Sequence, residues 1–240
     1  MWSTRMKNQV NRWLSIARQF RIPGTCELCL TQAGAAGFLC DTCLQTLARA
    51  AHACAQCAEP MTQPGRCGRC QSSPPAFDYG YSSFLYQPPI AHWIQAAKDR
   101  EQLVWLNRLA WLQAQHPPPT IHQADALIFI PAGRKKLLYR GYNPGELLTL
   151  RLGRLLNIPV LTDALEKTGG RDQRGLSAQD RKRNLRRSLR AGKRTFCGEH
   201  LLIIDDVLTT GATADAAARI LKKQGAGITG VWSLSRTARN

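Results

Sequence analysis

Eight of the nine cysteines in this 240-residue chain lie between residues 26 and 70, where they form four Cys-x-x-Cys pairs. Such a pair folds into a tight turn whose two thiolates converge on one metal ion, and two pairs supply the four soft ligands that tetrahedral zinc prefers. We therefore expect two zinc ions, which are structural because four thiolates leave no coordination position for a reacting water. The expected ligands are Cys26, Cys29, Cys40, Cys43, Cys54, Cys57, Cys67 and Cys70.

The spacing leaves the grouping of the four pairs open. The first two pairs could share one ion and the last two the other, or the pairs could interleave. Disulfides would need an oxidising compartment, to which nothing else in the sequence points, and four thiolates also bind iron–sulfur clusters. Cys197 stands apart from the pairs, and we interpret it as a small, buried apolar residue.

The cysteine-rich region divides the chain into an N-terminal helical segment at 1–23, a double zinc-knuckle module at 24–72 and a third domain at 77–240. The third domain alternates apolar runs of strand length with runs of helical periodicity. Such alternation indicates an α/β fold with a parallel, helix-covered sheet. We expect strands at 77–86, 126–130, 158–161, 201–204 and 228–234, and helices at 90–115, 145–156 and 213–224.

The most informative segment of this domain is an apolar strand that runs into two acids and then a small, hydroxyl-rich loop that opens a helix. Ligands of open α/β sheets bind at such strand ends. The loop and helix start offer backbone amides to a phosphate, and Gly211 permits close approach. Carboxylates would instead accept hydrogen bonds from sugar hydroxyls or order a hydrated magnesium ion. The expected catalytic residues are Asp205 and Asp206, and the expected substrate-binding residues are Val207, Leu208, Thr209, Thr210, Gly211, Ala212 and Thr213.

Two other interpretations of this segment carry less weight. A Walker-type ATPase would need a Gly-x-x-x-x-Gly-Lys-Ser/Thr loop, which the chain does not contain. A purely structural strand end would need two adjacent acids and an all-small loop to coincide by chance.

The 203–213 stretch resembles the phosphoribosyl-diphosphate signature of type I phosphoribosyltransferases. Together with the Cys-x-x-Cys module, it resembles the ComF/GntX family of DNA-uptake and DNA-utilisation proteins. The resemblance implies a type I phosphoribosyltransferase-like parallel sheet behind an N-terminal Cys-rich zinc-binding module. It also implies that 131–134 meets the diphosphate, that Arg140 and Asn143 support this loop, and that 205–213 holds ribose and 5′-phosphate. The further substrate-binding residues are Pro131, Ala132, Arg134, Arg140, Asn143, Lys98 and Lys167.

One position departs from the family pattern. Gln usually follows the Arg-Gly-Tyr-Asn motif, and Pro144 stands there in this chain. Proline suits the first turn of the following helix, because the amide at that position would be unpaired anyway.

The net charge of +17 favours polyanionic partners. Residues 167–194 carry eleven Lys and Arg against two Asp, which is more than half of the excess. A sugar diphosphate needs two or three cations, so the surplus points to a longer polyanion such as single-stranded DNA. A solvated hood loop over the ligand site is the alternative. The candidate nucleic-acid contacts are Arg181, Lys182, Arg183, Arg186, Arg187 and Arg190.

Three functions fit these features. The first is a phosphoribosyltransferase that uses the Mg²⁺ complex of phosphoribosyl diphosphate, with an unidentified acceptor and with turnover left open, acting in DNA uptake or utilisation. The second is a non-catalytic single-stranded-DNA-binding adaptor of DNA-uptake or helicase machinery. The third, a nucleotide-sensing regulator, would need a DNA-reading helix that the sequence does not show. No apolar run reaches transmembrane length, so we expect a cytoplasmic protein.

Overall fold

The computed structural model describes residues 24–35, 37–98, 103–133, 137–138, 141–167 and 189–238. The expected helical segment at 1–23 lies outside these residues. By its contacts the chain divides into two compact units, Met1–Thr46 and Leu47–Asn240. The sequence-based segments at 24–72 and 77–240 remain a prediction of module boundaries, and the division by contacts runs through the first of them.

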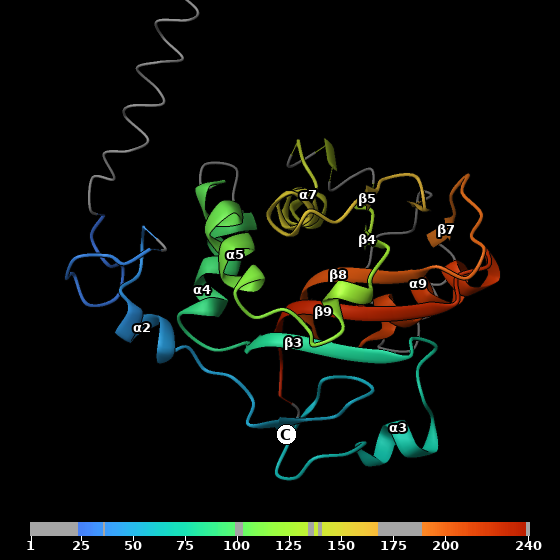
Figure 1. Cartoon of the computed structure of the whole chain (residues 1–240), viewed down its shortest axis with the longest axis horizontal. Helices are drawn as coiled ribbons and strands as arrows, with labels where there is room; N and C mark the ends of the chain where they lie inside the picture. Colours follow the sequence, from blue (N-terminus) through green and yellow to red (C-terminus); the bar gives the residue numbers. More distant parts are fainter. Residues whose placement is uncertain are drawn as a thin grey trace, which may run out of the picture. The chain divides into compact units, whose positions relative to one another are not determined.

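The second unit is built on a parallel sheet (Figure 1), which has five strands within the described residues, in the order β3-β9-β8-β4-β5. All four residues of β4 and the first five of β8 are buried, as expected for strands that helices cover on both faces. The expected parallel α/β fold is therefore confirmed. The strands are β3 (Tyr79–Leu85), β4 (Ala126–Phe129), β5 (Val160–Leu161), β8 (His200–Leu208) and β9 (Ile228–Arg236).

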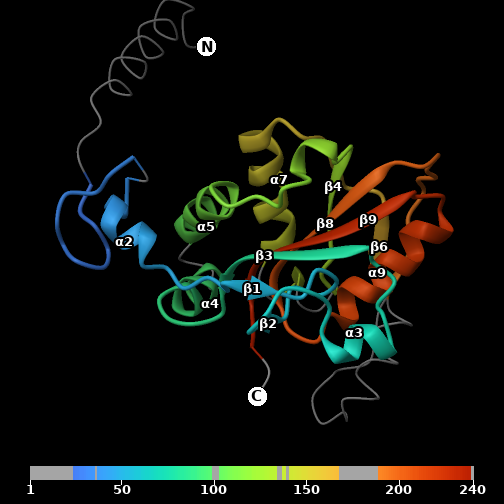
Figure 2. The ribbon, with the colours of Figure 1, turned by 60° about the horizontal axis from the view of Figure 1, so that its bottom comes forward.

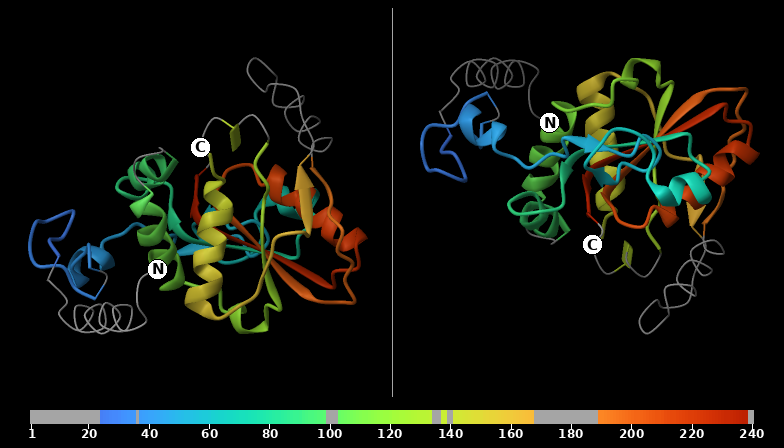
Figure 3. Two further views of the ribbon diagram at one scale, coloured as in Figure 1. Left: turned by 90° about the horizontal axis from the view of Figure 1, so that it is seen from above. Right: turned by 90° about the horizontal axis from the view of Figure 1, so that it is seen from below.

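Helices cover the two faces of the sheet. On one side, α9 packs on β8 and β9, and its alanines share a buried cluster with Ile128, Ile203 and Val231. On the other side, α7 packs on β4 and β8, and it also contacts α5, which contacts α4. Figures 2 and 3 show α7 and α9 on opposite sides of the strands. The helices are α4 (Ile90–Lys98), α5 (Val104–Ala114), α7 (Pro144–Leu156) and α9 (Ala212–Lys223).

Smaller elements complete the described chain. In the cysteine-rich region, β1 pairs antiparallel with β2, and β6 pairs antiparallel with β7 where the basic segment begins and ends. No helix of the described residues is long and apolar enough to cross a membrane. The elements are α2 (Asp41–Gln45), β1 (His52–Ala53), β2 (Pro60–Met61), α3 (Gly68–Ser72), the 3₁₀ turn η1 (Ile121–Gln123), β6 (Leu165–Lys167) and β7 (Leu189–Ala191).

The structure corrects two of the expected elements. The single helix predicted at 90–115 is two helices, α4 and α5, which pack against each other. The strand predicted to end at 204 continues to Leu208, because its ladder with β9 pairs Val207 with Ser235 and Leu208 with Arg236. The two acids therefore lie within the strand rather than beyond it.

Candidate ligand site at the acidic strand

The two acids of β8 face opposite sides of the sheet, since successive strand residues alternate. Asp206 lies on the side of α4, where its Oδ2 forms an ion pair with Nζ of Lys98 at 2.9 Å. Asp205 lies on the side of α9, and its Oδ1 accepts a hydrogen bond from the backbone N–H of Asp206 at 3.0 Å. The Asp206 side chain keeps partial access to solvent, so a ligand can reach it, whereas Asp205 is half-buried.

The electrostatics of the two acids differ. Burial raises the pKa of Asp205 to about 8, and the negative charge of Asp206 adds to this rise. The hydrogen bond from the Asp206 amide and the charge of Lys98 oppose the rise without cancelling it. At neutral pH the Asp205 side chain is therefore mainly a neutral carboxylic acid, which can donate a hydrogen bond as well as accept one.

The loop after β8, residues 208–213, is here called the cradle loop. It contains Gly211, whose φ of +75° is a left-handed conformation that suits glycine, and Gly211 forms the N-cap of α9. Oγ1 of Thr210 accepts a hydrogen bond from the backbone N–H of Ala212 at 3.3 Å. The first turn of this 12-residue helix thus presents amides and a positive dipole end next to exposed threonines, an arrangement suited to an anion.

A second loop, at 130–133, is tied to the start of α7. The buried Asn143 accepts a hydrogen bond from the N–H of Gly145 and donates one to the carbonyl of Ile130, both at 3.2 Å. Lys167, at the end of β6, passes close to Gly133: a Cβ added there would lie 3.8 Å from Cε of Lys167. Pro131 and Ala132 are half-buried in this loop. Arg134 and Arg140 lie outside the described residues.

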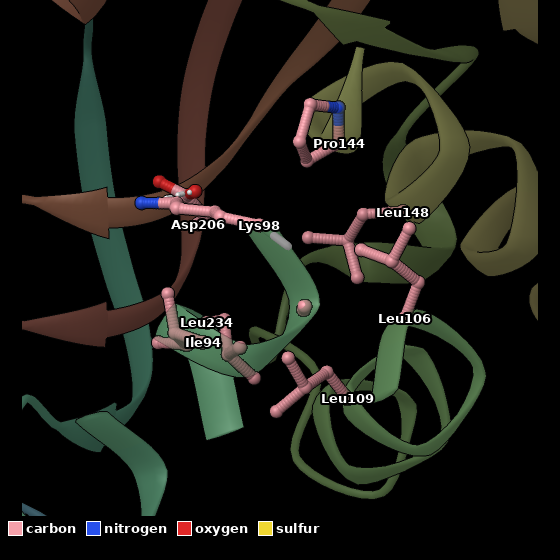
Figure 4. Close-up of a pocket in the computed structure, with 9 residues that line it drawn as sticks. Ile94, Lys98, Leu106, Leu109, Pro144, Leu148, Asp206 and Leu234 are labelled. Carbon is pink, nitrogen blue, oxygen red and sulfur yellow. Dashed lines mark ion pairs between the residues drawn. The ribbon is translucent and has the colours of Figure 1, made fainter. Parts of the chain in front are cut away.

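A narrow apolar cavity adjoins the Lys98–Asp206 ion pair (Figure 4). Its walls come from α4, α5, α7 and β9, and the ion pair supplies its charged groups. Proline at position 144, the departure from the family pattern, is one of the lining residues and begins α7, as its fixed φ favours. The apolar lining residues are Ile94, Ala97, Leu106, Leu109, Pro144, Leu148 and Leu234.

The cysteines form two clusters, in each of which all four sulfur atoms lie within 4.8 Å of one another. The Sγ atoms of Cys29 and Cys40 are 3.6 Å apart, and those of Cys57 and Cys67 are 3.7 Å apart. Tetrahedral zinc with bonds of about 2.3 Å places sulfur atoms about 3.8 Å apart, whereas a disulfide needs about 2.05 Å. The donor sets therefore suit structural zinc. The pairs group sequentially, as Cys26, Cys29, Cys40 and Cys43, and as Cys54, Cys57, Cys67 and Cys70.

Three expectations about other residues have different outcomes. Cys197 is exposed, so its interpretation as a buried residue is wrong; it lies in a turn where its N–H donates to Glu199. Arg190 is exposed on β7, opposite Glu166 of β6. The other five candidate nucleic-acid contacts, at 181–187, lie outside the described residues.

Sequence reasoning missed two arginines that contact the cradle loop. Arg236, at the end of β9, donates to the carbonyls of Leu208 and Thr209. Arg69, in α3, donates to the carbonyl of Thr210 at 3.2 Å. Arg236 could have been noticed as the first charged residue after the apolar strand predicted at 228–234. No feature of the sequence distinguished Arg69 from the other arginines.

The parallel sheet, the acidic strand with its small-residue cradle loop and the two Cys₄ clusters define the class of protein: an α/β protein with a candidate ligand site at a strand end and two cysteine clusters whose donor sets suit zinc. No family model matches the chain. It is 32% identical over 224 residues to DNA utilization protein YhgH of Shigella flexneri, covering 90% of this chain and 98% of that protein. It is also 32% identical over 208 residues to Competence protein F of Haemophilus influenzae, covering 82% and 90%. The chain thus belongs to the ComF/GntX family of DNA-utilisation and competence proteins.

Solved structures give a weaker likeness. Purine phosphoribosyltransferase from Pyrococcus horikoshii superposes with a TM-score of 0.35 and 17% identity, covering 55% of this chain and 82% of that one.

Proposed function

We propose that the chain binds phosphoribosyl diphosphate as its Mg²⁺ complex and acts in the uptake or utilisation of DNA. One observation carries the proposal: a single strand places two adjacent acids directly before a glycine-capped helix start that suits a phosphate. In this arrangement the acids receive the ribose hydroxyls while the cradle loop receives the 5′-phosphate. The names of the two relatives support the role in DNA use.

The diphosphate end of the ligand would lie at the 130–133 loop. Lys167 passes along this loop and supplies a cation there, and Asn143 holds the loop to α7. Mg²⁺ would neutralise part of the diphosphate charge and would be held through the carboxylate of Asp206. A ribose hydroxyl would compete with Lys98 for the Asp206 carboxylate, and an ammonium group displaced from Oδ2 would be available to the ligand's phosphates.

We propose binding without transfer of the phosphoribosyl group, because no described residue near the cradle loop stands out as a general base for an acceptor. A cytoplasmic setting fits the chemistry of the clusters, since thiols stay reduced there and available to zinc.

The test is calorimetric titration of the full chain with phosphoribosyl diphosphate and Mg²⁺, with ribose 5-phosphate and pyrophosphate as separate ligands. We expect saturable binding that Asp206→Asn weakens at least tenfold. Glu166→Gln, an exposed acid on β6, is the matched control and should bind as the parent does. Absence of saturable binding, or equal affinity in the Asp206→Asn variant, would refute the proposal.

A non-catalytic single-stranded-DNA-binding adaptor, working with DNA-uptake or helicase machinery, is the second candidate. The net charge of +17 and the exposed Arg190 favour it. Binding of an oligonucleotide should weaken steeply as salt rises, because each neutralised phosphate releases counterions. The two candidates separate on Asp206→Asn, which should leave oligonucleotide affinity unchanged if the adaptor uses only basic residues.

A further inference from the structure

We propose that the second cysteine module, residues 52–72, supports the cradle loop, and that Arg236 and Arg69 are the positioning residues that join the two. The anion site would then depend on the module that carries the cluster of Cys54, Cys57, Cys67 and Cys70. The ligand of this site rests on the proposed function, whereas the mechanical link does not.

Arg236 is the main connection. Its side chain is 1% exposed and reaches from the end of β9 into the second cysteine module, where Nε donates to the carbonyl of Cys57 at 3.1 Å and a terminal nitrogen pairs with Glu59. Its other terminal nitrogen donates to the carbonyl of Leu208 at 2.6 Å and to that of Thr209. One guanidinium group therefore contacts both the backbone of a metal ligand and the first two residues of the cradle loop.

The buried position of Arg236 is stable only if the second cysteine module and the cradle loop are both in place. A guanidinium group withdrawn from water is costly unless its donors are matched and its charge is paired. Glu59 supplies the opposite charge, and the carbonyls of the module and the loop take the remaining donors. Displacing the module would leave Arg236 buried with unmatched donors, so the loop and the module are held as one unit.

Two further links join the same parts. Arg69, next to the ligand Cys70 in α3, donates to the carbonyl of Thr210 at 3.2 Å. The buried Gln56, next to the ligand Cys57, donates to the carbonyl of Phe77 at 2.5 Å. The ring of Phe77 lies against Gly211, 3.8 Å from where a Cβ would stand.

The polarity of these links matters for binding. Both arginines hold carbonyl oxygens of the cradle loop, at Leu208, Thr209 and Thr210. A peptide unit that turns its carbonyl toward the module turns its N–H the other way. The links therefore favour a loop whose amides face away from the module, where an anion could accept from them. In Figure 2 the module, with β1, β2 and α3, lies beside the end of β9 and the start of α9.

Arg69 gives a test that does not endanger folding, because its side chain is exposed. We would measure hydrogen exchange of the cradle-loop amide that is hydrogen-bonded within the loop, that of Ala212, which donates to Oγ1 of Thr210. The full chain is measured without ligand in parent, Arg69→Ala and Arg69→Lys, and in Arg66→Ala, an exposed arginine of the same module, as the matched control. Loss of one hydrogen bond should speed exchange about two- to tenfold in Arg69→Ala. Arg69→Lys should restore slow exchange in part, and Arg66→Ala should match the parent.

Arg236 is replaced together with Glu59, because removing the guanidinium alone takes away the cation with which the Glu59 carboxylate pairs. Arg236→Met/Glu59→Gln, which removes both charges together, should speed exchange at 208–213 at least tenfold while β4 stays protected. Zinc content is measured in each variant. Unchanged exchange at 208–213 in both Arg69→Ala and the double variant overturns the inference, whatever ligand the site binds.

Affinity for phosphoribosyl diphosphate is the final measurement and separates this inference from the proposed function. Faster exchange with weaker binding supports both. Faster exchange in the variants, combined with a parent chain that binds no phosphoribosyl diphosphate, supports the mechanical link and refutes the proposed function.

Discussion

Substituting Asp205 by Asn should flatten the pH dependence of the free energy of unfolding. The pKa of Asp205 is raised to about 8, chiefly by burial and then by the charge of Asp206, whereas an unfolded Asp has a pKa of about 3.9. Between these values the unfolded chain is ionised at this residue and the folded chain is protonated. The unfolded state thus binds fewer protons, and the stability contribution falls as pH rises, with a limiting slope of about 1.4 kcal/mol per pH unit.

The measurement is urea unfolding of parent and Asp205→Asn at pH 5.5 and pH 7.5, in buffer that keeps zinc constant. Between pH 5.5 and pH 7.5, the parent should lose on the order of 2 kcal/mol more of its unfolding free energy than the Asp205→Asn variant does. Asparagine keeps an oxygen that can accept from the Asp206 amide, so the substitution changes the charge more than the shape. Other titrating groups affect both proteins and cancel in the difference.

Asp206→Asn is the matched variant. It removes the neighbouring negative charge, the second cause of the raised pKa, but leaves the burial of Asp205 in place. The fall in stability should therefore finish at a lower pH than in the parent and should not disappear. Parallel pH profiles for parent and Asp205→Asn would refute the reasoning, because they would mean that Asp205 ionises alike in the folded and unfolded chains.

Three other outcomes are expected. Asn143→Ala should lower the free energy of unfolding by about 1 kcal/mol or more, since it removes the cap of α7 and the bond to Ile130; thermal unfolding measures this. Lys98→Met should change the free energy of unfolding by less than about 1 kcal/mol, because the ion pair with Asp206 is partly exposed. The same substitution should lower the affinity for phosphoribosyl diphosphate severalfold, as measured by calorimetric titration. Gly230→Ala should destabilise the sheet by about 1–3 kcal/mol in urea unfolding, because its Cβ would stand 2.3 Å from the Tyr79 ring.

Features that depend on neighbours in the sequence could be predicted without the structure. A Cys-x-x-Cys pair defines its own turn, so the ligand pairs follow from spacing, and the structure had only to settle how the pairs group. The segment around Gly211 likewise contains its own strand end, glycine and helix start, and it folds as that pattern indicates. Local chemistry of this kind survives in any tertiary setting.

Features that depend on distant partners could not be predicted. The β6–β7 ladder joins Lys167 to Leu189 across the basic segment, and neither short strand has a pattern of its own. The exposure of Cys197 follows from a turn before β8 and not from the residue's chemistry. Arg69 meets Thr210 across 141 residues of sequence, a contact that no local pattern encodes.

Arg236 lies between these two cases, and it shows what a sequence can still yield once a parallel sheet is predicted. Neighbouring parallel strands bring their carboxyl ends to one edge, and here the register places Arg236 beside Leu208, the last residue of β8. A charged residue that closes a buried strand must find acceptors at that edge, because it cannot stay there unpaired. The acceptors nearest to it are the carbonyls where the neighbouring strand enters the cradle loop, and the structure adds those of the second cysteine module. An arginine at the end of a buried strand beside a ligand loop therefore indicates a support for that loop, even before its other partner is known.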